Sequence, residues 1–164
     1  KKKLNNIKYD YIIISNSLRS KMTKDFFHSS KYLVNNLINE IDYGKVDGLT
    51  LRETKNKFPY LFKKWQRKID VKFPGGENSN DVKKRALKFL RFLSRYKNGS
   101  KILIISHSFF LRVLISIMLK INLYDAFKIK IDHLKIFQFL KKGRYIYSNL
   151  NKIDQQNIFN QLYD

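Results

Sequence analysis

A histidine and an arginine each follow a short apolar run in this sequence. Ile102 to Ile105 leads into Ser106-His107, and Tyr11 to Ile14 leads into the polar stretch Ser15 to Arg19. An arginine presents a rigid fork of donors to a phosphate or carboxylate group, and a histidine titrates near neutral pH. Together these residue types predict an oxyanion site.

The segment around the histidine is best interpreted as two elements. As a single span, Ile102 to Leu119 is long enough to cross a bilayer, but an arginine such as Arg112 near its centre would cost about 2.5 to 3.5 kcal/mol. A buried parallel strand, a turn at His107 and a helix remove this conflict. The apolar stripe of that helix, expected to lie in the core, is Leu111, Leu114, Ile115, Met118 and Leu119.

The position of both residues at strand ends determines where they should meet. Parallel strands in one sheet place their carboxyl ends at the same edge, so Arg19 and His107 are expected to lie close together. Open parallel sheets bind ligands at that edge, and the N-terminus of a following helix favours an anion.

The other elements follow from local signals. Helices are expected over Ser17 to His28, from a capping box at Thr50 and Glu53, and again from Pro59 through Trp65. Tyr32 to Ile41 reads as extended or irregular. A longer helix is expected to be capped by Ser79 or Asn80 and to end at Gly99. Its apolar stripe consists of Val82, Ala86, Phe89, Leu90, Leu93 and Tyr96.

Two strands near the C-terminus complete the prediction. Leu134 to Leu140 and Tyr145 to Tyr147 form a hairpin pattern that suits the edge of the sheet. The resulting fold class is a three-layer α/β/α arrangement with a mostly parallel sheet. We found no repeat, low-complexity segment or linker, so residues 1–164 are expected to form a single domain.

Composition restricts the class of protein. The chain has 164 residues, of which 43% are apolar and 15% aromatic, so it is not a disordered chain. It has no cysteine, which excludes disulfides and thiolate metal sites. No signal peptide or membrane span is evident, and we expect a cytoplasmic protein without membrane contact.

The net charge of +21 has two interpretations. It would suit nucleic acid, an anionic membrane or an acidic substrate. The lysines are nevertheless scattered among asparagines and isoleucines, without a basic run or an aromatic-rich RNA signature. We therefore expect no specific nucleic-acid binding.

Four motifs in this order resemble the histidine phosphatase superfamily, which includes the cofactor-dependent phosphoglycerate mutases. They are a serine-rich turn with an arginine, an acidic loop, a glycine loop followed by a helix, and a second histidine motif. In this sequence they are Ser15 to Arg19 with Thr23, Glu40 to Gly44 with Asp47 to Thr50, Pro74 to Glu77 with Arg85, and Ser106-His107 with Arg112.

The resemblance implies phosphoryl transfer through a phosphohistidine, with no metal and no cofactor. In the family the nucleophilic histidine lies in an Arg-His-Gly tripeptide at the end of the first strand, and this tripeptide is absent here. Lys1 to Asn6 correspond to the region before the family's second strand. We therefore expect a fragment that lacks the first strand and is inactive alone, in preference to a pseudoenzyme.

The resemblance also implies roles for individual residues. Arg19 and His107 would bracket the phosphate, and Glu40 would protonate the leaving oxygen, although Asp42 and Asp47 are close in sequence. Tyr43 and Ser108 would contact substrate, with Ser108 standing where the family usually has glycine. His28 and His133 match no motif and are assigned to the surface and to an edge strand, respectively.

The predicted function is hydrolysis of a small phosphorylated metabolite. A mutase is the alternative, but the long basic insertion of mutases is absent between Gly48 and Gly76, and Phe109 stands where they have asparagine. The third hypothesis is a noncatalytic protein that binds a phosphorylated ligand or nucleic acid. Substrate identity and oligomeric state stay open.

Overall fold

The computed structural model describes residues 7–29, 31–67, 70–128, 130–132, 136–142 and 145–148. Its central sheet has three parallel strands in the order β2-β1-β3, formed by Tyr11–Ile14 (β1), Tyr32–Val34 (β2) and Ile102–Ile105 (β3). Ile13 is paired with Leu33 on one side and with Ile104 on the other. The predicted α/β class with a mostly parallel sheet is confirmed.

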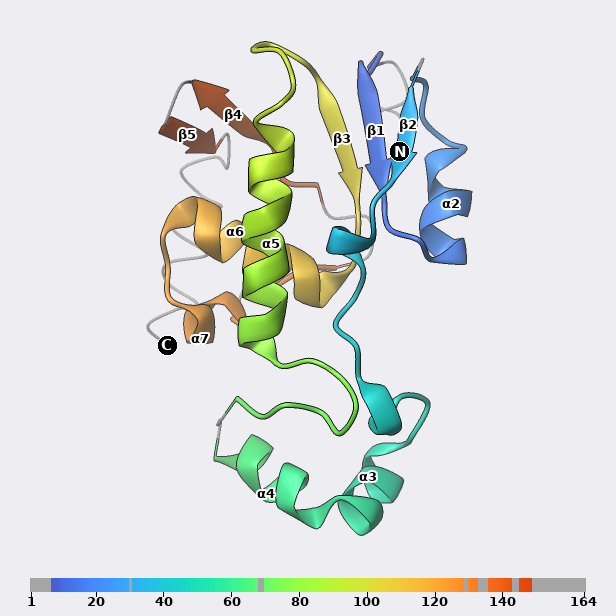
Figure 1. Ribbon diagram of the computed structural model, residues 1–164, viewed down its shortest axis with the longest axis vertical. Helices are drawn as coiled ribbons and strands as arrows, with labels where there is room; N and C mark the ends of the chain where they lie inside the picture. The colour runs from blue at the N-terminus through green and yellow to red at the C-terminus, as the bar shows by residue number, and fades with distance from the viewer. Residues whose placement is uncertain are drawn as a thin grey trace.

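The two faces of the sheet are packed differently. Ile13 of β1 is fully buried, in one core cluster with Phe89 of α5 (Ser79–Leu93) and Phe110 of α6 (Ser108–Leu119). Ile12 and Ile14 point the other way, into a smaller cluster. In Figure 1, α5 and α2 (Leu18–Lys24) lie on opposite sides of the strands.

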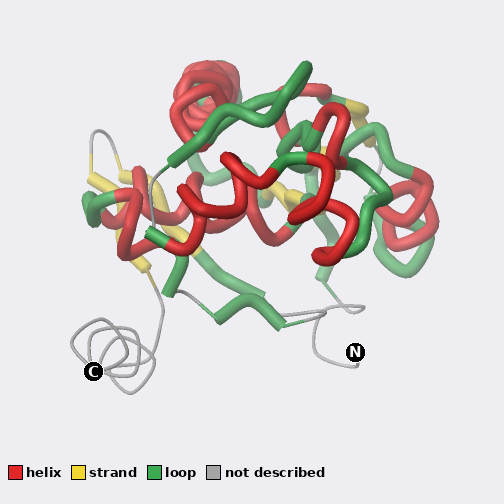
Figure 2. Tube along the Cα trace, turned by 90° about the horizontal axis from the view of Figure 1, so that it is seen from below, coloured by secondary structure: helices red, strands yellow, loops and turns green. Residues whose placement is uncertain are grey.

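The segment between β2 and α5 extends beyond the carboxyl ends of the strands. It contains two 3-10 turns, η1 (Asn36–Ile38) and η2 (Gly44–Val46), and two short helices, α3 (Leu51–Lys57) and α4 (Pro59–Gln66). Figure 1 shows these helices below the strand ends, and Figure 2, seen from below, shows helices in front of the strands. A backbone contact ties this segment together, because the Lys45 N–H donates to Pro74 O at 2.9 Å.

Several predicted boundaries hold. Thr50 and Glu53 form the predicted capping box at the start of α3. Pro59 is the first residue of α4, as a residue without a backbone N–H favours. In α6, Leu114 and Ile115 are buried, while Leu111, Met118 and Leu119 are only half-buried.

Other boundaries differ from the prediction. The first helix ends at Lys24 instead of His28. Helix α5 is capped by Asn78, whose side chain accepts from the Asp81 N–H, and neither Ser79 nor Asn80 is the cap. The same helix ends at Leu93, well before Gly99.

The C-terminal hairpin is present. Strands β4 (Phe139–Lys142) and β5 (Tyr145–Ser148) pair antiparallel, but in the described parts of the chain they form a sheet of their own and do not lie at the edge of the central sheet as predicted. Before it, the chain forms the short helix α7 (Leu123–Ala126). The predicted start of the hairpin at Leu134, and His133 beside it, lie outside the described residues. None of the helices that are described is long and apolar enough to span a membrane.

Candidate active site

The structure brings Arg19 and His107 together at the carboxyl edge of the sheet. Arg19 lies in the first turn of α2, and His107 is the N-cap of α6. Nε and Nη2 of Arg19 lie 3.1 and 2.7 Å from Nδ1 of His107. Arg19 is exposed and His107 is buried.

The other ring nitrogen of His107 faces a cluster of serine hydroxyls. Ser15 Oγ lies 2.7 Å from Nε2, and it donates to Ser20 Oγ at 2.7 Å. Ser17 Oγ is a more distant neighbour, at 3.4 Å from Nε2. Since guanidinium groups only donate, Nδ1 is the acceptor, and the proton of the neutral ring is therefore assigned to Nε2.

This environment disfavours the charged form of His107. Burial lowers the pKa of His107 below its ordinary value, and the nearby Arg19 and Arg85 guanidinium groups lower this pKa further. The Glu40 carboxylate acts in the opposite direction. With no anion bound, His107 is therefore neutral at physiological pH.

Glu40 reaches the same place from the loop after η1. Its carboxylate accepts from the Phe110 N–H at 3.3 Å and more weakly from the Phe109 N–H at 3.5 Å. These are N–H groups of the first turn of α6, which have no acceptor within the helix. Glu40 is thus held beside the helix N-terminus that begins at His107.

The two neighbouring acids point elsewhere. Asp42 accepts from the Gly44 N–H at 2.8 Å, which is a local turn contact. Asp47 is exposed. Among the three candidates for the general acid, only Glu40 is bound to the helix that carries His107.

Arg85 of α5 holds the Glu40 loop in place. Its guanidinium group donates to the backbone oxygens of Leu37 and Asn39, each at 2.7 Å, and to that of Glu40 at 3.1 Å. The other side of the fork binds both carboxylate oxygens of Glu77, at 2.8 and 3.0 Å. A single half-buried arginine thus connects the acidic loop to the glycine loop.

The two predicted substrate contacts lie at the edge of this site. Tyr43 is half-buried and packs edge-on against Phe73, with ring centroids 5.0 Å apart. Burial raises the pKa of the Tyr43 hydroxyl, the Glu40 charge raises it further, and Arg112 lowers it. Ser108 is the first residue of α6, so its backbone N–H belongs to the first turn of that helix.

Sequence reasoning assigned no role to Ser15 or Ser20. Both are almost completely buried, and both belong to the network around His107. The available signal was the spacing of serines around the end of a buried strand. Hydroxyls there are expected to need buried partners.

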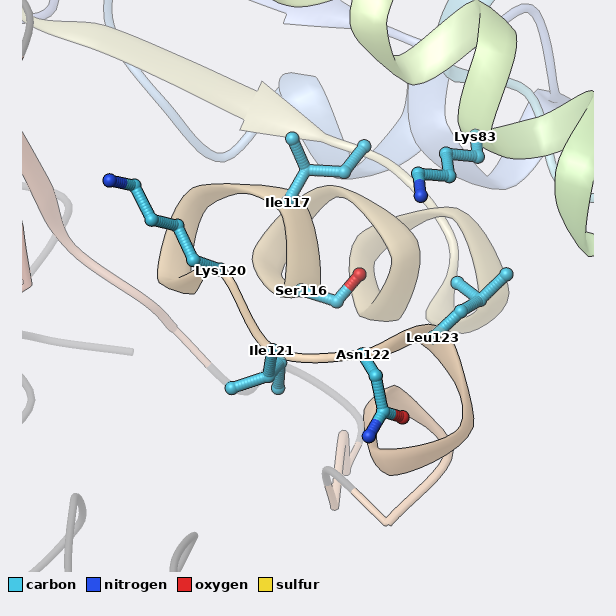
Figure 3. Close-up of a pocket in the computed structure, with 7 residues that line it drawn as sticks. All are labelled: Lys83, Ser116, Ile117, Lys120, Ile121, Asn122 and Leu123. Atoms are coloured by element: carbon cyan, nitrogen blue, oxygen red, sulfur yellow. The ribbon is translucent and has the colours of Figure 1, made fainter.

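Two other features are separate from this site. His28 is exposed, and its backbone oxygen accepts from the Tyr9 N–H, at the amino end of β1. A pocket of about 350 Å³ lies between α5 and the end of α6, lined by Lys83, Ser116 and Lys120 among others (Figure 3). Within the described ranges no group of three or more His, Asp or Glu side chains is placed to hold a metal ion.

Curated relatives match part of the chain. A 2,3-bisphosphoglycerate-dependent phosphoglycerate mutase of Methylorubrum extorquens (strain PA1) is 31% identical over 87 residues, which are 51% of this chain and 41% of that protein. The corresponding enzyme of Bradyrhizobium diazoefficiens is 34% identical over 90 residues, or 52% and 42% of the two chains. The chain therefore matches less than half the length of these relatives.

Solved structures share the fold. The α-ribazole phosphatase of Shigella flexneri superimposes with a TM-score of 0.80 at 18% identity, over 89% of this chain and 74% of that one. A mycobacterial glucosyl-3-phosphoglycerate phosphatase in complex with inorganic phosphate gives a TM-score of 0.69 at 17% identity, over 86% and 75%. The family model of the histidine phosphatase superfamily, branch 1, matches residues 1–146. The chain belongs to the histidine phosphatase superfamily.

Proposed function

We propose that this protein is a phosphomonoester hydrolase that acts on a small phosphorylated metabolite through a phosphohistidine intermediate. The observation that carries the proposal is the convergence of Arg19, His107 and Glu40 at the N-terminus of α6. Two groups suited to bind an oxyanion thus lie next to a carboxyl group suited to acid-base work.

Arg19 and His107 would bind the phosphoryl group. A phosphoryl group in transfer spreads negative charge over its oxygens, so fixed cations and N–H donors stabilise it. The Arg19 guanidinium would exchange its contact with Nδ1 of His107 for phosphate oxygens. His107 would then donate to the same group from Nδ1 after taking up a proton.

Glu40 would act as acid and then as base. In the first step a histidine nitrogen forms a bond to phosphorus, the bond to the leaving oxygen breaks, and that oxygen takes the Glu40 proton. In the second step Glu40 takes a proton from water, the water oxygen bonds to phosphorus, and the nitrogen–phosphorus bond breaks. The Glu40 carboxylate would therefore take up a proton from solvent before the first step, and the second step restores that protonated form.

The nucleophilic histidine is proposed to come from a segment before Lys1. Among the described residues β3 is an outer strand of the sheet, and its free edge offers a place for a further parallel strand. A strand in that position would end at the edge that carries His107. The loop after it would then face the phosphate site.

The test extends the protein by the coding sequence that precedes Lys1. The extended protein is assayed on a generic phosphomonoester, with and without EDTA. The proposal predicts an upstream Arg-His-Gly after an apolar run, and activity that survives chelation. An upstream sequence without such a histidine, together with no activity, would leave a phospholigand-binding protein and reject the enzyme.

A variant pair assigns the general acid. Glu40→Gln in the active extended protein should lower kcat by about 10²- to 10⁴-fold, the usual contribution of a positioned acid or base. Asp47→Asn is the matched control, because Asp47 lies in the same acidic segment but is exposed. A larger loss with Asp47→Asn than with Glu40→Gln would reverse the assignment.

The similarity to phosphoglycerate mutases supports a second candidate. A mutase would move the phosphoryl group between positions of a phosphoglycerate and would depend on 2,3-bisphosphoglycerate. Adding 2,3-bisphosphoglycerate to an assay on a phosphoglycerate distinguishes the two. Isomerisation that requires this addition would favour the mutase over the hydrolase.

A further inference from the structure

We infer that a buried pair of serine hydroxyls, Ser15 and Ser20, positions His107 so that Nδ1, and not Nε2, is the nitrogen that faces the anion. This inference deepens the proposed function and rests on it for the identity of the anion site. It assigns Ser15 and Ser20 as positioning residues, since they act on the phosphate only through the imidazole ring.

The direction of each hydrogen bond supports the inference. Ser15 Oγ donates its proton to Ser20 Oγ, so toward His107 it presents a lone pair. A lone pair at 2.7 Å from Nε2 is satisfied only by an Nε2–H donor. The Arg19 donors at Nδ1 require the same tautomer from the opposite side of the ring.

Burial makes this arrangement selective. The exposed fraction is 0% for Ser15 and 2% for Ser20, so water cannot easily replace either hydroxyl. The Ser15 N–H also donates to Ile105 O at 3.1 Å, which fixes the serine relative to the strand that leads to His107. Reversing the tautomer would set an Nδ1–H against the two Arg19 donors and would turn the Ser15 hydroxyl away from Ser20, which is costly.

The inference then predicts that His107 takes up one proton when an anion binds. The charged groups that affect His107 are Arg19 of α2, Arg85 of α5 and Glu40 of the loop after η1. When an anion takes the Arg19 donors, Nδ1 faces an acceptor oxygen in place of N–H groups. Nδ1 can donate a hydrogen bond to this oxygen only after it has taken up a proton from solvent. The Nε2–H group keeps its hydrogen bond to Ser15 Oγ.

The experiment uses ¹⁵N NMR of the histidine rings in the whole chain, above the pH at which His107 titrates. His107 in the wild type should show a protonated Nε2 and an unprotonated Nδ1. In an Arg19→Ala background, where the Arg19 donors no longer face Nδ1, Ser15→Ala and Ser20→Ala should move the population toward the other tautomer, because each removes the Ser15-to-Ser20 donation. Ser116→Ala is the matched control, since Ser116 is equally buried but donates only within its own helix, to Val113 O at 2.7 Å.

Two results would overturn the inference. One is a wild-type His107 that carries its proton on Nδ1. The other is a spectrum of the Arg19→Ala, Ser20→Ala double variant with the same tautomer ratio as Arg19→Ala alone, a test that remains available where Ser15→Ala does not fold.

Sulfate separates this inference from the proposed function. Its charge is constant over the pH range in which histidine titrates, so a pH-dependent affinity reports the protein. We expect sulfate to bind more weakly as pH rises, and about tenfold more weakly to Ser15→Ala than to the wild type. An extended protein without activity would reject the enzyme but leave the tautomer result intact, whereas a wrong tautomer would reject the positioning role even in an active enzyme.

Discussion

Two nitrogens of Arg19, Nε and Nη2, lie against a single atom, Nδ1 of His107, at 3.1 and 2.7 Å. The arginine therefore occupies the contact that a phosphate oxygen would need on the histidine, and the histidine occupies one face of the arginine fork. Under the proposed function, an anion that enters would have to separate this pair. The two groups proposed to bind the anion thus lie against each other.

The first prediction concerns the titration of His107. Burial and Arg19 both lower the pKa of His107, so NMR titration should place it below the ordinary histidine value of about 6.5. Arg19→Ala should raise this pKa, because it removes a neighbouring positive charge. Lys21→Ala, an exposed change on the same helix, should leave it almost unchanged. A fall in the pKa of His107 after Arg19→Ala would contradict the assignment.

The same pKa shift predicts how stability varies with pH. His107 binds fewer protons in the folded chain than in the unfolded one at pH values between its two pKa values. The free energy of unfolding should therefore rise with pH across this window. The contribution is complete above the unfolded pKa and is lost as pH falls through that value toward the folded one. Urea unfolding over this range, compared with His107→Gln, isolates the contribution of His107.

The Arg85 contacts should stabilise the folded chain more than an ordinary surface ion pair does. Its side chain is 12% exposed and serves both Glu77 and the backbone of the Glu40 loop. Arg85→Ala leaves the Glu77 carboxylate with the Asp42 N–H in place of the guanidinium group, and it removes the donor to these carbonyl groups, so we expect a loss of about 3 kcal/mol in urea unfolding.

Two comparisons test the role of Arg85. Arg85→Lys should recover little, since an ammonium group cannot reproduce the fork. Lys72→Ala breaks the pair between the exposed Lys72 side chain and Asp81 and should cost much less than Arg85→Ala. Equal losses for Arg85→Ala and Lys72→Ala would show that the Arg85 contacts add nothing to stability.

A pair of glycine substitutions tests the contact between the acidic loop and the glycine loop. Gly44 and Gly48 both have positive φ, at 53° and 76°. A Cβ at Gly44 would lie 2.3 Å from Pro74 O, whereas one at Gly48 meets nothing within 4 Å. Gly48→Ala should cost about 1 to 2 kcal/mol from backbone conformation alone, and Gly44→Ala clearly more. Equal losses in thermal unfolding would mean that the two loops move apart at little cost.

The core beneath the site predicts a large loss for Phe89→Ala. Phe89 is fully buried, and its ring lies 6.1 Å from that of Phe110 and 6.0 Å from that of Phe92. Removing it should lower the free energy of unfolding by about 3 to 5 kcal/mol. Leu87→Ala on the exposed side of the same helix should change it by less than about 0.5 kcal/mol, and a similar loss for both would contradict the packing.

Much of the fold was predictable because local signals and packing agree. The apolar runs of β1 and β3 become adjacent strands, so residues far apart in sequence, Arg19 and His107, reach one edge as predicted. The capping box at Thr50 and Glu53 depends only on residues three apart, and it forms as predicted. Such features need no information from the rest of the chain.

Helix ends were less predictable because several local choices have similar energies. Asn78, Ser79 and Asn80 are all residue types that cap helices. The Ser79 N–H donates to the Asp70 carboxylate, a residue nine positions away, and the helix begins with Asn78 as its cap. At the other end of α5, Tyr96 leaves the helix and packs on Tyr11 of β1, with ring centroids 4.5 Å apart.

The sequence by itself determined the strands, their polar ends and the order of the family motifs, since these depend on residue type and short spacing. Only the tertiary structure decided which acid meets α6, which serines support His107 and what Arg85 holds. Those relationships depend on hydrogen-bond direction and burial between segments separated by as many as 92 positions, as for Ser15 and His107. Burial gives these contacts their selectivity, because a buried polar group without a partner is costly.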